Sequence, residues 1–138
     1  MGETCVFCKI VKSEIPSERV YEDEKYMAFL DINPVNLGHT LIIPREHYAN
    51  FSETPEQTLS QMTGIAKKIA PAIQSAVNAP AFNVMFNNGP EAGQAVFHVH
   101  MHIIPRFADD GFKLWHGRGG YGEGEMSATA KKIKEKIQ

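Results

Sequence analysis

Short apolar runs separated by polar turn formers dominate the first third of the chain, a pattern typical of paired strands. Residues 20–22 and 26–32 flank a polar turn at 23–25, and the second run contains the aromatic and β-branched side chains that favour strands. A third apolar run covers residues 38–44. The pattern therefore predicts three strands, the first two paired across the turn.

An apolar stripe at three- and four-residue steps predicts one long helix in the middle of the chain. The stripe consists of Leu59, Met62, Ala66, Ile69, Ile73 and Val77. Before it, residues 54–57 fit a capping box in which the Thr54 hydroxyl accepts from the backbone N–H of Gln57, with a proline at the first helical position. Pro71 should kink or interrupt this helix.

The second half of the chain predicts two further strands, at residues 83–86 and 97–105, joined by a loop of turn formers at 87–93. A glycine-rich stretch follows, and then a short helix from about Ser127 whose apolar side chains share one face. The predicted fold is α+β, with an antiparallel five-stranded sheet, one main helix and a C-terminal helix. Residues 1–138 are expected to form a single domain, with a C-terminal loop and helix over 108–138.

Composition and charge exclude several classes of function. The net charge of −2 over 138 residues offers no basic excess for binding a nucleic acid polymer. No apolar run approaches the roughly 18 residues of a membrane span, and the first residues lack the plan of a signal peptide. We therefore expect a cytoplasmic protein that neither enters a membrane nor binds nucleic acid polymers.

The densest chemical signal is the alternation around three histidines near residue 100. On a strand, alternation places His98, His100 and His102 on one face, each about 6.6 to 7 Å from the next. The intervening residues, Phe97, Val99, Met101 and Ile103, would then face the core. Half of the chain's 6 histidines on one strand face indicate a site rather than ordinary packing.

Two chemistries fit this histidine face. Two imidazoles spaced by one residue can bind one metal ion, which would activate water for hydrolysis. Alternatively, an imidazole is substantially neutral at pH 7 and can attack phosphorus directly as a nucleophile. The flanking histidines would then contact phosphate oxygens. The pattern of residues leaves both possibilities open.

Residues 98–104 read HVHMHII, which resembles the His-φ-His-φ-His-φ-φ motif of the histidine triad (HIT) superfamily, where φ is apolar. The similarity extends to DINP at 31–34, GHTLIIPREH at 38–47, NNGPEAGQ at 87–94 and CVFCKI at 5–10. It covers roughly residues 4 to 107 and is strongest to the bacterial Hint-like branch. The resemblance implies a HIT-like fold and a homodimer whose two sheets join into one.

The resemblance also implies an enzyme that acts on the α-phosphorus of a purine nucleotide, such as a nucleoside phosphoramidate or a dinucleoside polyphosphate. By position, His100 is the implied nucleophile, with its tautomer fixed by a backbone carbonyl. It would form a covalent nucleotidyl-histidine, which water would hydrolyse to the nucleoside monophosphate. His39 and His102 map near the phosphate, and Asn87 and Gln94 are implied polar contacts.

For the nucleoside, the resemblance implies that Asp31 binds the ribose hydroxyls and that an apolar wall holds the base. The implied wall consists of Phe7, Ile10, Phe29 and Ile32. Read from the residues alone, these four are ordinary core and Asp31 is a turn cap before Pro34. Ala95 stands where many Hint-like proteins carry serine, which bears on the choice of leaving group but not on the attack.

Cys5 and Cys8 have the Cys-x-x-Cys spacing shared by redox pairs and zinc half-sites. The resemblance supplies His47 and His98 as the other two ligands of a structural zinc ion, which would leave His100 and His102 free for chemistry. The alternative is a pair of buried thiols with no metal. At the level of function, the alternatives are a metal-dependent hydrolase that uses the triad histidines, and a nucleotide-binding or partner-binding module with incidental activity.

Overall fold

The structure, a computed structural model, describes residues 4–113, 115, 117 and 119–138. Five strands form one sheet in the order β1-β2-β3-β5-β4, and every neighbouring pair is antiparallel. The strands are β1 Arg19–Glu22, β2 Tyr26–Leu30, β3 Thr40–Pro44, β4 Ala81–Met85 and β5 Met101–Arg106. The predicted five-stranded α+β architecture is therefore confirmed.

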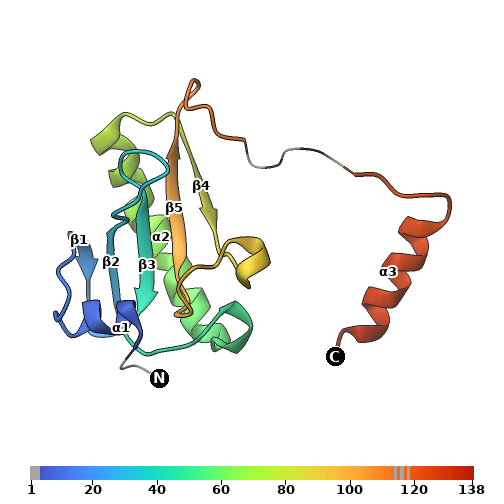
Figure 1. Cartoon of the computed structure of the whole chain (residues 1–138), viewed down its shortest axis with the longest axis horizontal. Coiled ribbons are helices and arrows are strands. Elements are labelled where there is room, and N and C mark those ends of the chain that lie inside the picture. The colour runs from blue at the N-terminus through green and yellow to red at the C-terminus, as the bar shows by residue number, and fades with distance from the viewer. Residues whose placement is uncertain (1–3, 114, 116, 118) are drawn as a thin grey trace.

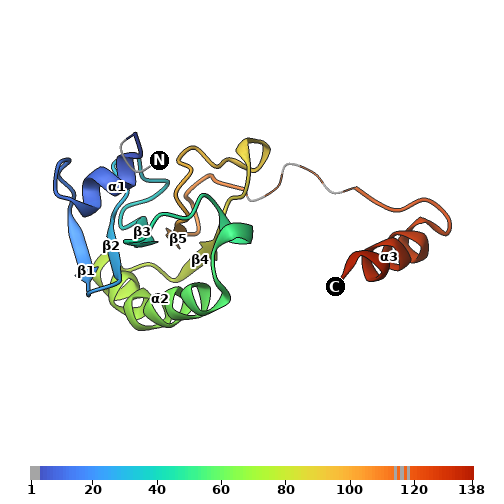
Figure 2. The same ribbon diagram turned by 90° about the horizontal axis from the view of Figure 1, so that it is seen from below.

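Helices α1 (Val6–Val11) and α2 (Glu56–Val77) lie on opposite faces of the sheet (Figures 1 and 2). Alternate residues of β2 and β3 serve the two faces: Ala28 and Ile42 pack with α2, whereas Phe29 and Ile43 belong to the cluster with α1. Both faces of these strands are covered, so each large apolar side chain contributes about 1.5 to 3 kcal/mol through burial.

Helix α2 differs from the prediction at its start and is continuous through Pro71, so the predicted interruption is wrong. Pro71 lies on an exposed face of the helix. Pro55 is the N-cap and makes no side-chain cap bond, so the predicted capping box is also wrong. The Thr54 hydroxyl instead donates to the carbonyl of Asn50, at 2.7 Å. Thr54 is the C-cap of a 3-10 turn at Phe51–Glu53, which precedes the helix.

The strand that carries the histidines begins later than predicted. Strand β5 starts at Met101, so His98 and His100 lie in the irregular segment before it, which bends at residues 96–98, and only His102 is in the strand. The backbone N–H of Val99 donates to the carbonyl of Tyr48 at 2.7 Å, which attaches this segment to the loop after β3 rather than to a strand. Phe97 is 48% exposed, so its predicted place in the core is wrong.

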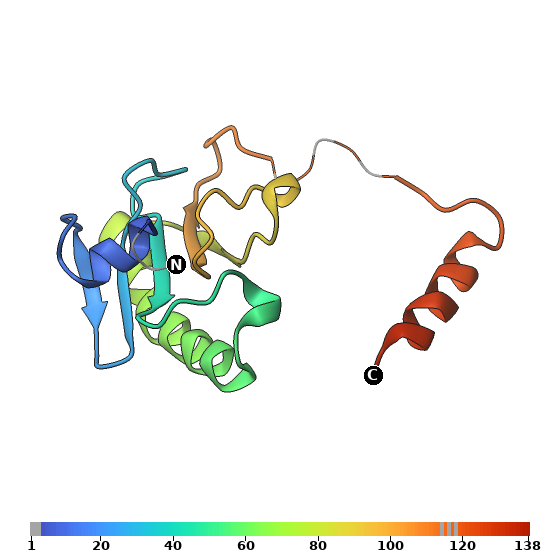
Figure 3. The ribbon, with the colours of Figure 1, turned by 60° about the horizontal axis from the view of Figure 1, so that its bottom comes forward.

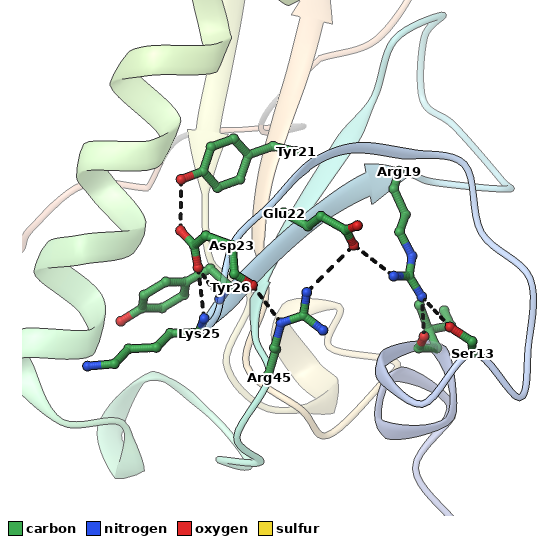
Figure 4. A network of polar contacts seen from close by, with 9 residues as sticks. Ser13, Arg19, Tyr21, Glu22, Asp23, Lys25, Tyr26 and Arg45 are labelled. Carbon is green, nitrogen blue, oxygen red and sulfur yellow. Dashed lines mark hydrogen bonds and ion pairs between the residues drawn. The ribbon is translucent and has the colours of Figure 1, made fainter.

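Helix α1 was not predicted, whereas the polar turn between β1 and β2 is confirmed. Figure 4 shows this turn, in which one oxygen of Asp23 accepts from the backbone N–H groups of Lys25 and Tyr26, both at 2.8 Å. Arg45 donates from Nε to the Asp23 carbonyl at 2.8 Å, which ties the turn to the end of β3. These bonds set the register between the first three strands.

The C-terminal helix α3 (Glu125–Lys136) begins two residues before the predicted start at Ser127 and has no buried residues. It lies apart from the sheet, on the side of the β4 edge (Figures 1 and 3). Its N-cap, Gly124, has φ 73°, a conformation that glycine adopts without strain. None of the described helices is both long enough and apolar enough to cross a membrane.

Candidate active site

The tautomer of His100 follows from one hydrogen bond. Its Nδ1 lies 2.7 Å from the backbone carbonyl of His98, and a carbonyl can only accept. Nδ1 therefore carries the hydrogen, and Nε2 of the neutral ring holds a free lone pair. Phe7 packs edge-on against this ring, with centroids 5.0 Å apart, and helps to fix its orientation. His100 thus presents one nucleophilic nitrogen in a defined direction.

A chain of hydrogen bonds sets the opposite tautomer at His102. The backbone N–H of Val35 donates to Nδ1 of His39 at 3.0 Å, so the hydrogen of neutral His39 sits on Nε2. That Nε2–H points at Nδ1 of His102, 2.9 Å away, which must then accept. His102 consequently carries its hydrogen on Nε2, a buried atom with no partner within the described ranges.

Local backbone geometry brings His39 into this chain. Gly38 has φ +90°, and a Cβ there would lie 3.1 Å from the Val77 side chain, so the turn into β3 favours glycine. His39 is only 3% exposed. Its Nε2 also lies 3.7 Å from Asp31 Oδ2, so the carboxylate would stabilise a positive charge on the paired imidazoles.

Burial keeps these imidazoles neutral at physiological pH. Desolvation lowers the pKa of His39 and of His100 and lowers that of His102 to about 4. The neighbouring imidazoles His100 and His39 lower the pKa of His102 further, whereas Asp31 raises it. At pH 7 the nucleophilic lone pair of His100 and the donor of His102 are therefore both present.

The depressed pKa of His102 makes folding stability depend on pH. Because its folded pKa of about 4 lies below the ordinary value of 6.5, the unfolded chain binds more protons between these values. Stability should fall as pH drops from 7 to 5, by about 1 kcal/mol from this partly exposed group. Urea unfolding at both pH values tests this. His102→Gln should flatten the dependence, and an unchanged slope would contradict the assignment.

A cavity of about 250 Å³ opens beside His102. It is lined by Val35, His39, Asn83, Met85, Asn87, His102, Ile104, Arg106, Phe112 and Lys113. His100 is 8% exposed and lies next to His102, with ring centroids 4.9 Å apart. The structure thus brings five of the predicted residues together: Asp31, His39, Asn87, His100 and His102.

Gln94 is placed differently from Asn87, because its amide is bonded to backbone groups. Its oxygen accepts from the N–H of Gly89 at 3.0 Å, and its nitrogen donates to the carbonyls of Ala49 and Val96 at 2.8 and 3.1 Å. The side chain is 4% exposed. These bonds hold the loop over residues 87–94 in place against the loop that follows β3.

The predicted nucleoside residues lie on the α1 side of the sheet. Phe7, Ile10 and Phe29 are buried in one cluster there, which agrees with their interpretation as core residues. Ile32, in contrast, is 89% exposed just beyond the end of β2. Asp31 accepts from the backbone N–H of Asn33 at 2.9 Å, the turn cap that the residues alone indicate.

A second cluster joins Cys5, Cys8, His47 and His98. Nδ1 of His98 lies 3.5 Å from each cysteine sulfur and 3.2 Å from Nδ1 of His47, which is 3.4 Å from the Cys8 sulfur. A tetrahedral zinc ion with ordinary bond lengths separates two nitrogens by about 3.3 Å and a nitrogen from a sulfur by about 3.6 Å. The observed separations fit zinc without rearrangement.

The protonation of the cluster also suits a metal. Nε2 of His98 donates to the Pro44 carbonyl at 2.8 Å, so Nδ1 of the neutral ring offers its lone pair to the cluster. Burial, reinforced by Cys5, raises the pKa of Cys8 to about 11, so binding of a metal must displace a proton. The triad histidines therefore divide between two sites, with His98 in the metal cluster and His102 beside His39.

Sequence reasoning missed one polar group beside the cavity, built on Arg106 and Asp110. The two residues are four apart and make hydrogen bonds from Nε and Nη2 at 2.7 and 3.0 Å. Bonds to Asp110, largest among them those from Arg106, lower the pKa of this carboxyl well below its ordinary range. The sequence shows that Arg106 and Asp110 are four residues apart and oppositely charged, but it does not show that they border a cavity.

Comparison with known proteins supports a common origin for these features. The HIT domain model matches residues 12–109. The hit protein of Bacillus subtilis is 50% identical over 112 residues, which cover 80% of this chain and 77% of that protein. The adenylylsulfatase HINT3 of Arabidopsis thaliana is 46% identical over 102 residues, 74% of this chain and 52% of that protein.

Solved structures agree with this match. A Streptococcus mutans protein superposes with a TM-score of 0.91 and 41% identity, covering 98% of this chain and 86% of that one. A histidine triad nucleotide-binding protein of Candida albicans superposes with a TM-score of 0.83 and 36% sequence identity, and the match covers 96% of each chain. A zinc-bound histidine triad protein of Mycobacterium smegmatis superposes with a TM-score of 0.75 and 35% sequence identity. The match covers 99% of this chain and 100% of that one. From its motifs, fold and relatives, the chain belongs to the HIT domain family.

Proposed function

We propose that this protein hydrolyses purine nucleotides at the α-phosphorus through a covalent nucleotidyl-histidine on His100. The observation that carries this proposal is the pair of complementary nitrogens, the lone pair on His100 Nε2 and the buried N–H on His102 Nε2. A nucleophilic nitrogen beside a hydrogen-bond donor suits a phosphate group, because the nitrogen can attack phosphorus while the donor binds a phosphate oxygen. The nucleotide-binding relative in Candida and the adenylylsulfatase in Arabidopsis support a nucleotide substrate.

In the first step, the lone pair of His100 Nε2 forms a bond to phosphorus while the bond to the leaving group breaks. The leaving group departs with that electron pair, and the imidazole becomes positively charged. The His98 carbonyl, 2.7 Å from Nδ1, stabilises this charge. An anionic group such as sulfate leaves as it stands, whereas the nitrogen of a phosphoramidate takes a proton from solvent before the bond breaks and leaves as ammonia. Water then attacks phosphorus, the P–N electron pair returns to His100, and a nucleoside monophosphate and a proton are released. His102 donates to a phosphate oxygen throughout.

The remaining residues divide by position around the phosphate. Asn87, in the cavity wall, would contact the phosphate or leaving group. Gln94 would act by holding the loop that carries Asn87. On the α1 side, Asp31 would bind the ribose hydroxyls. The exposed Ile32 would cover the base, beside the buried apolar cluster that contains Phe7, Ile10 and Phe29.

Zinc is the metal that we propose for the Cys5, Cys8, His47 and His98 cluster, in a structural role. The separations of the donor atoms and the zinc-bound mycobacterial relative support it. Bound there, zinc would cross-link the N-terminal helix to the loop after β3 and to the start of the triad. A reducing cytoplasm is the compartment in which both thiols stay available as ligands.

We also propose a homodimer in which two sheets join through β4. This strand lies at one end of the sheet, and its side chains Phe82 and Val84 are 39% and 46% exposed. An apolar edge strand with unpaired backbone groups is a template for pairing with another chain. Helix α3 lies beyond this edge and exposes Met126, Ile133 and Ile137, so a second copy would find further apolar surface there.

Val84→Lys should convert the dimer to a monomer, because a charge in the joined edge weakens association by about 100-fold or more. Light scattering at several concentrations measures the effect. Val20→Lys is the matched control, since Val20 is equally exposed, at 49%, on the opposite edge strand β1. A wild-type monomer, or dissociation caused only by the control, would contradict pairing through β4.

Release of adenosine monophosphate from adenosine 5′-phosphoramidate tests the enzymatic proposal directly. Quenching the reaction in alkaline denaturant, which preserves the acid-labile P–N bond, followed by mass spectrometry of peptides at alkaline pH should find the nucleotidyl group on His100. An adduct on another residue would reassign the nucleophile. Turnover with no adduct at any time would favour attack by water.

A further inference from the structure

The segment after β5 folds back over the cavity because a buried ion pair holds it there. Asp110, whose side chain is 5% exposed, accepts from Nε and Nη2 of Arg106 and from the backbone N–H groups of Phe107 and Phe112. Arg106 Nη2 also donates to the carbonyl of Phe112. The chain therefore turns sharply after β5, and Lys113 comes to line the cavity.

Two further bonds attach this turn to the walls of the cavity. Asn36, from the loop before His39, donates to Asp110 at 3.0 Å and to the carbonyl of Pro105 at 2.9 Å. Arg106 Nη1 donates to Asn83 of β4 at 2.9 Å. The position of the Lys113 backbone is consequently tied to both sides of the cavity by side chains that are already paired.

Lys113 is the one cation in the cavity wall that has no ion-pair partner in the described part of the chain. Arg106, the other permanent cation there, is neutralised by Asp110. The two lining histidines are neutral at pH 7, because burial lowers the pKa of both. An anion that enters the cavity therefore meets one uncompensated positive charge, the ammonium of Lys113.

The direction of the cavity decides which part of a substrate meets this charge. Alternate residues of β5 share one face, so the lining runs from His102 through Ile104 to Arg106, away from His100. In a direct displacement at phosphorus, the leaving group departs opposite the nucleophile. With His100 on one side of the phosphate, the leaving group lies toward Lys113. The nucleoside lies on the same face of the sheet but beside α1 and β2, where Phe7, Ile10 and Phe29 cluster.

We propose that Lys113 is a specificity-determining residue that selects nucleotides with an anionic leaving group, such as sulfate or a phosphate chain. The inference rests on the proposed hydrolysis at the α-phosphorus. As the bond to phosphorus breaks, an anionic leaving group gains further negative charge, which an ammonium stabilises most in the transition state. A leaving group that departs as ammonia gains no such benefit.

The test compares two substrates that share the adenosine and the α-phosphate. Adenosine 5′-phosphosulfate carries an anionic leaving group, and adenosine 5′-phosphoramidate releases ammonia. Lys113→Ala should lower kcat/KM for the phosphosulfate about tenfold, and by less than about twofold for the phosphoramidate. Lys113→Arg should restore most of the selectivity, and added salt should reduce it in the wild type alone.

Lys12→Ala is the matched control, because Lys12 is exposed at the end of α1, far along the chain from the cavity, and should leave both rates unchanged. Equal losses on both substrates, or no loss on either, in Lys113→Ala would overturn the role of Lys113 while leaving the hydrolase intact. If the wild type turns over neither substrate, the proposed hydrolysis fails, and the inference fails with it.

Discussion

Replacing His100 with alanine should reduce the release of nucleoside monophosphate by about 10³-fold or more and should remove the covalent adduct. In the proposed mechanism the imidazole supplies the lone pair that attacks phosphorus, and its Nδ1 is fixed on the His98 carbonyl. The measurement is turnover of adenosine 5′-phosphoramidate at matched concentration, with folding checked by circular dichroism and binding of adenosine monophosphate by calorimetry.

His102→Gln serves as the comparison, because glutamine keeps an N–H donor while removing the imidazole. We expect it to retain the adduct and to lose less activity than His100→Ala. Equal rates in wild type and His100→Ala would exclude the covalent route and favour activated water. Tight binding of the monophosphate by a wild-type protein with negligible turnover would instead indicate a binding module.

Removal of the metal should have the largest effect on stability. Zinc that binds only the folded chain at about 1,000 times its Kd adds about 4 kcal/mol, which for a chain of this size corresponds to about 12 °C in Tm. We expect a loss of this order for Cys5→Ala combined with Cys8→Ala and for the wild type treated with a chelator. Differential scanning calorimetry measures the loss, and elemental analysis should find one zinc per wild-type chain.

Glu14→Ala, at an exposed position just after α1, controls for changes near this helix that lie outside the cluster and should retain both metal and Tm. Persistence of one zinc per chain in the double cysteine variant would show that the metal binds elsewhere. A wild type that contains no zinc and is indifferent to chelator would leave Cys5 and Cys8 as two buried thiols.

The sheet could be predicted because its pattern is local. Strands β2 and β3 are continuous apolar runs bounded by turn formers, and the stripe of α2 is regular along its length. The misses occur where tertiary contacts prevail. Thr54 fits the sequence pattern of a helix cap, yet its hydroxyl donates to the carbonyl of Asn50 instead. Helix α1 has only six residues and depends on packing against the sheet, so no stripe could indicate it.

The candidate site shows a similar division. The spacing marked the triad histidines and the two cysteines, because these residue types are rare, whereas the resemblance to the HIT superfamily supplied His39, His47 and Asn87. The resemblance implied a backbone carbonyl for His100, but no pattern of side chains reveals which backbone groups set the tautomers. These groups belong to Pro44, His98 and Val35. The Arg106–Asp110 pair was missed for a related reason, because only the folded turn brings it to the cavity.

The Nε2–H of His102, which has no partner among the described residues, limits how far this fold can be stabilised. A buried donor without an acceptor lowers stability by about 1 to 3 kcal/mol, and an apolar ring of similar size would avoid that penalty. Selection for folding alone would therefore replace His102. A design that only stabilised the sheet would remove this donor. Under the proposed mechanism it would also lose the contact to the phosphate, so activity and maximal stability could not be combined at this position.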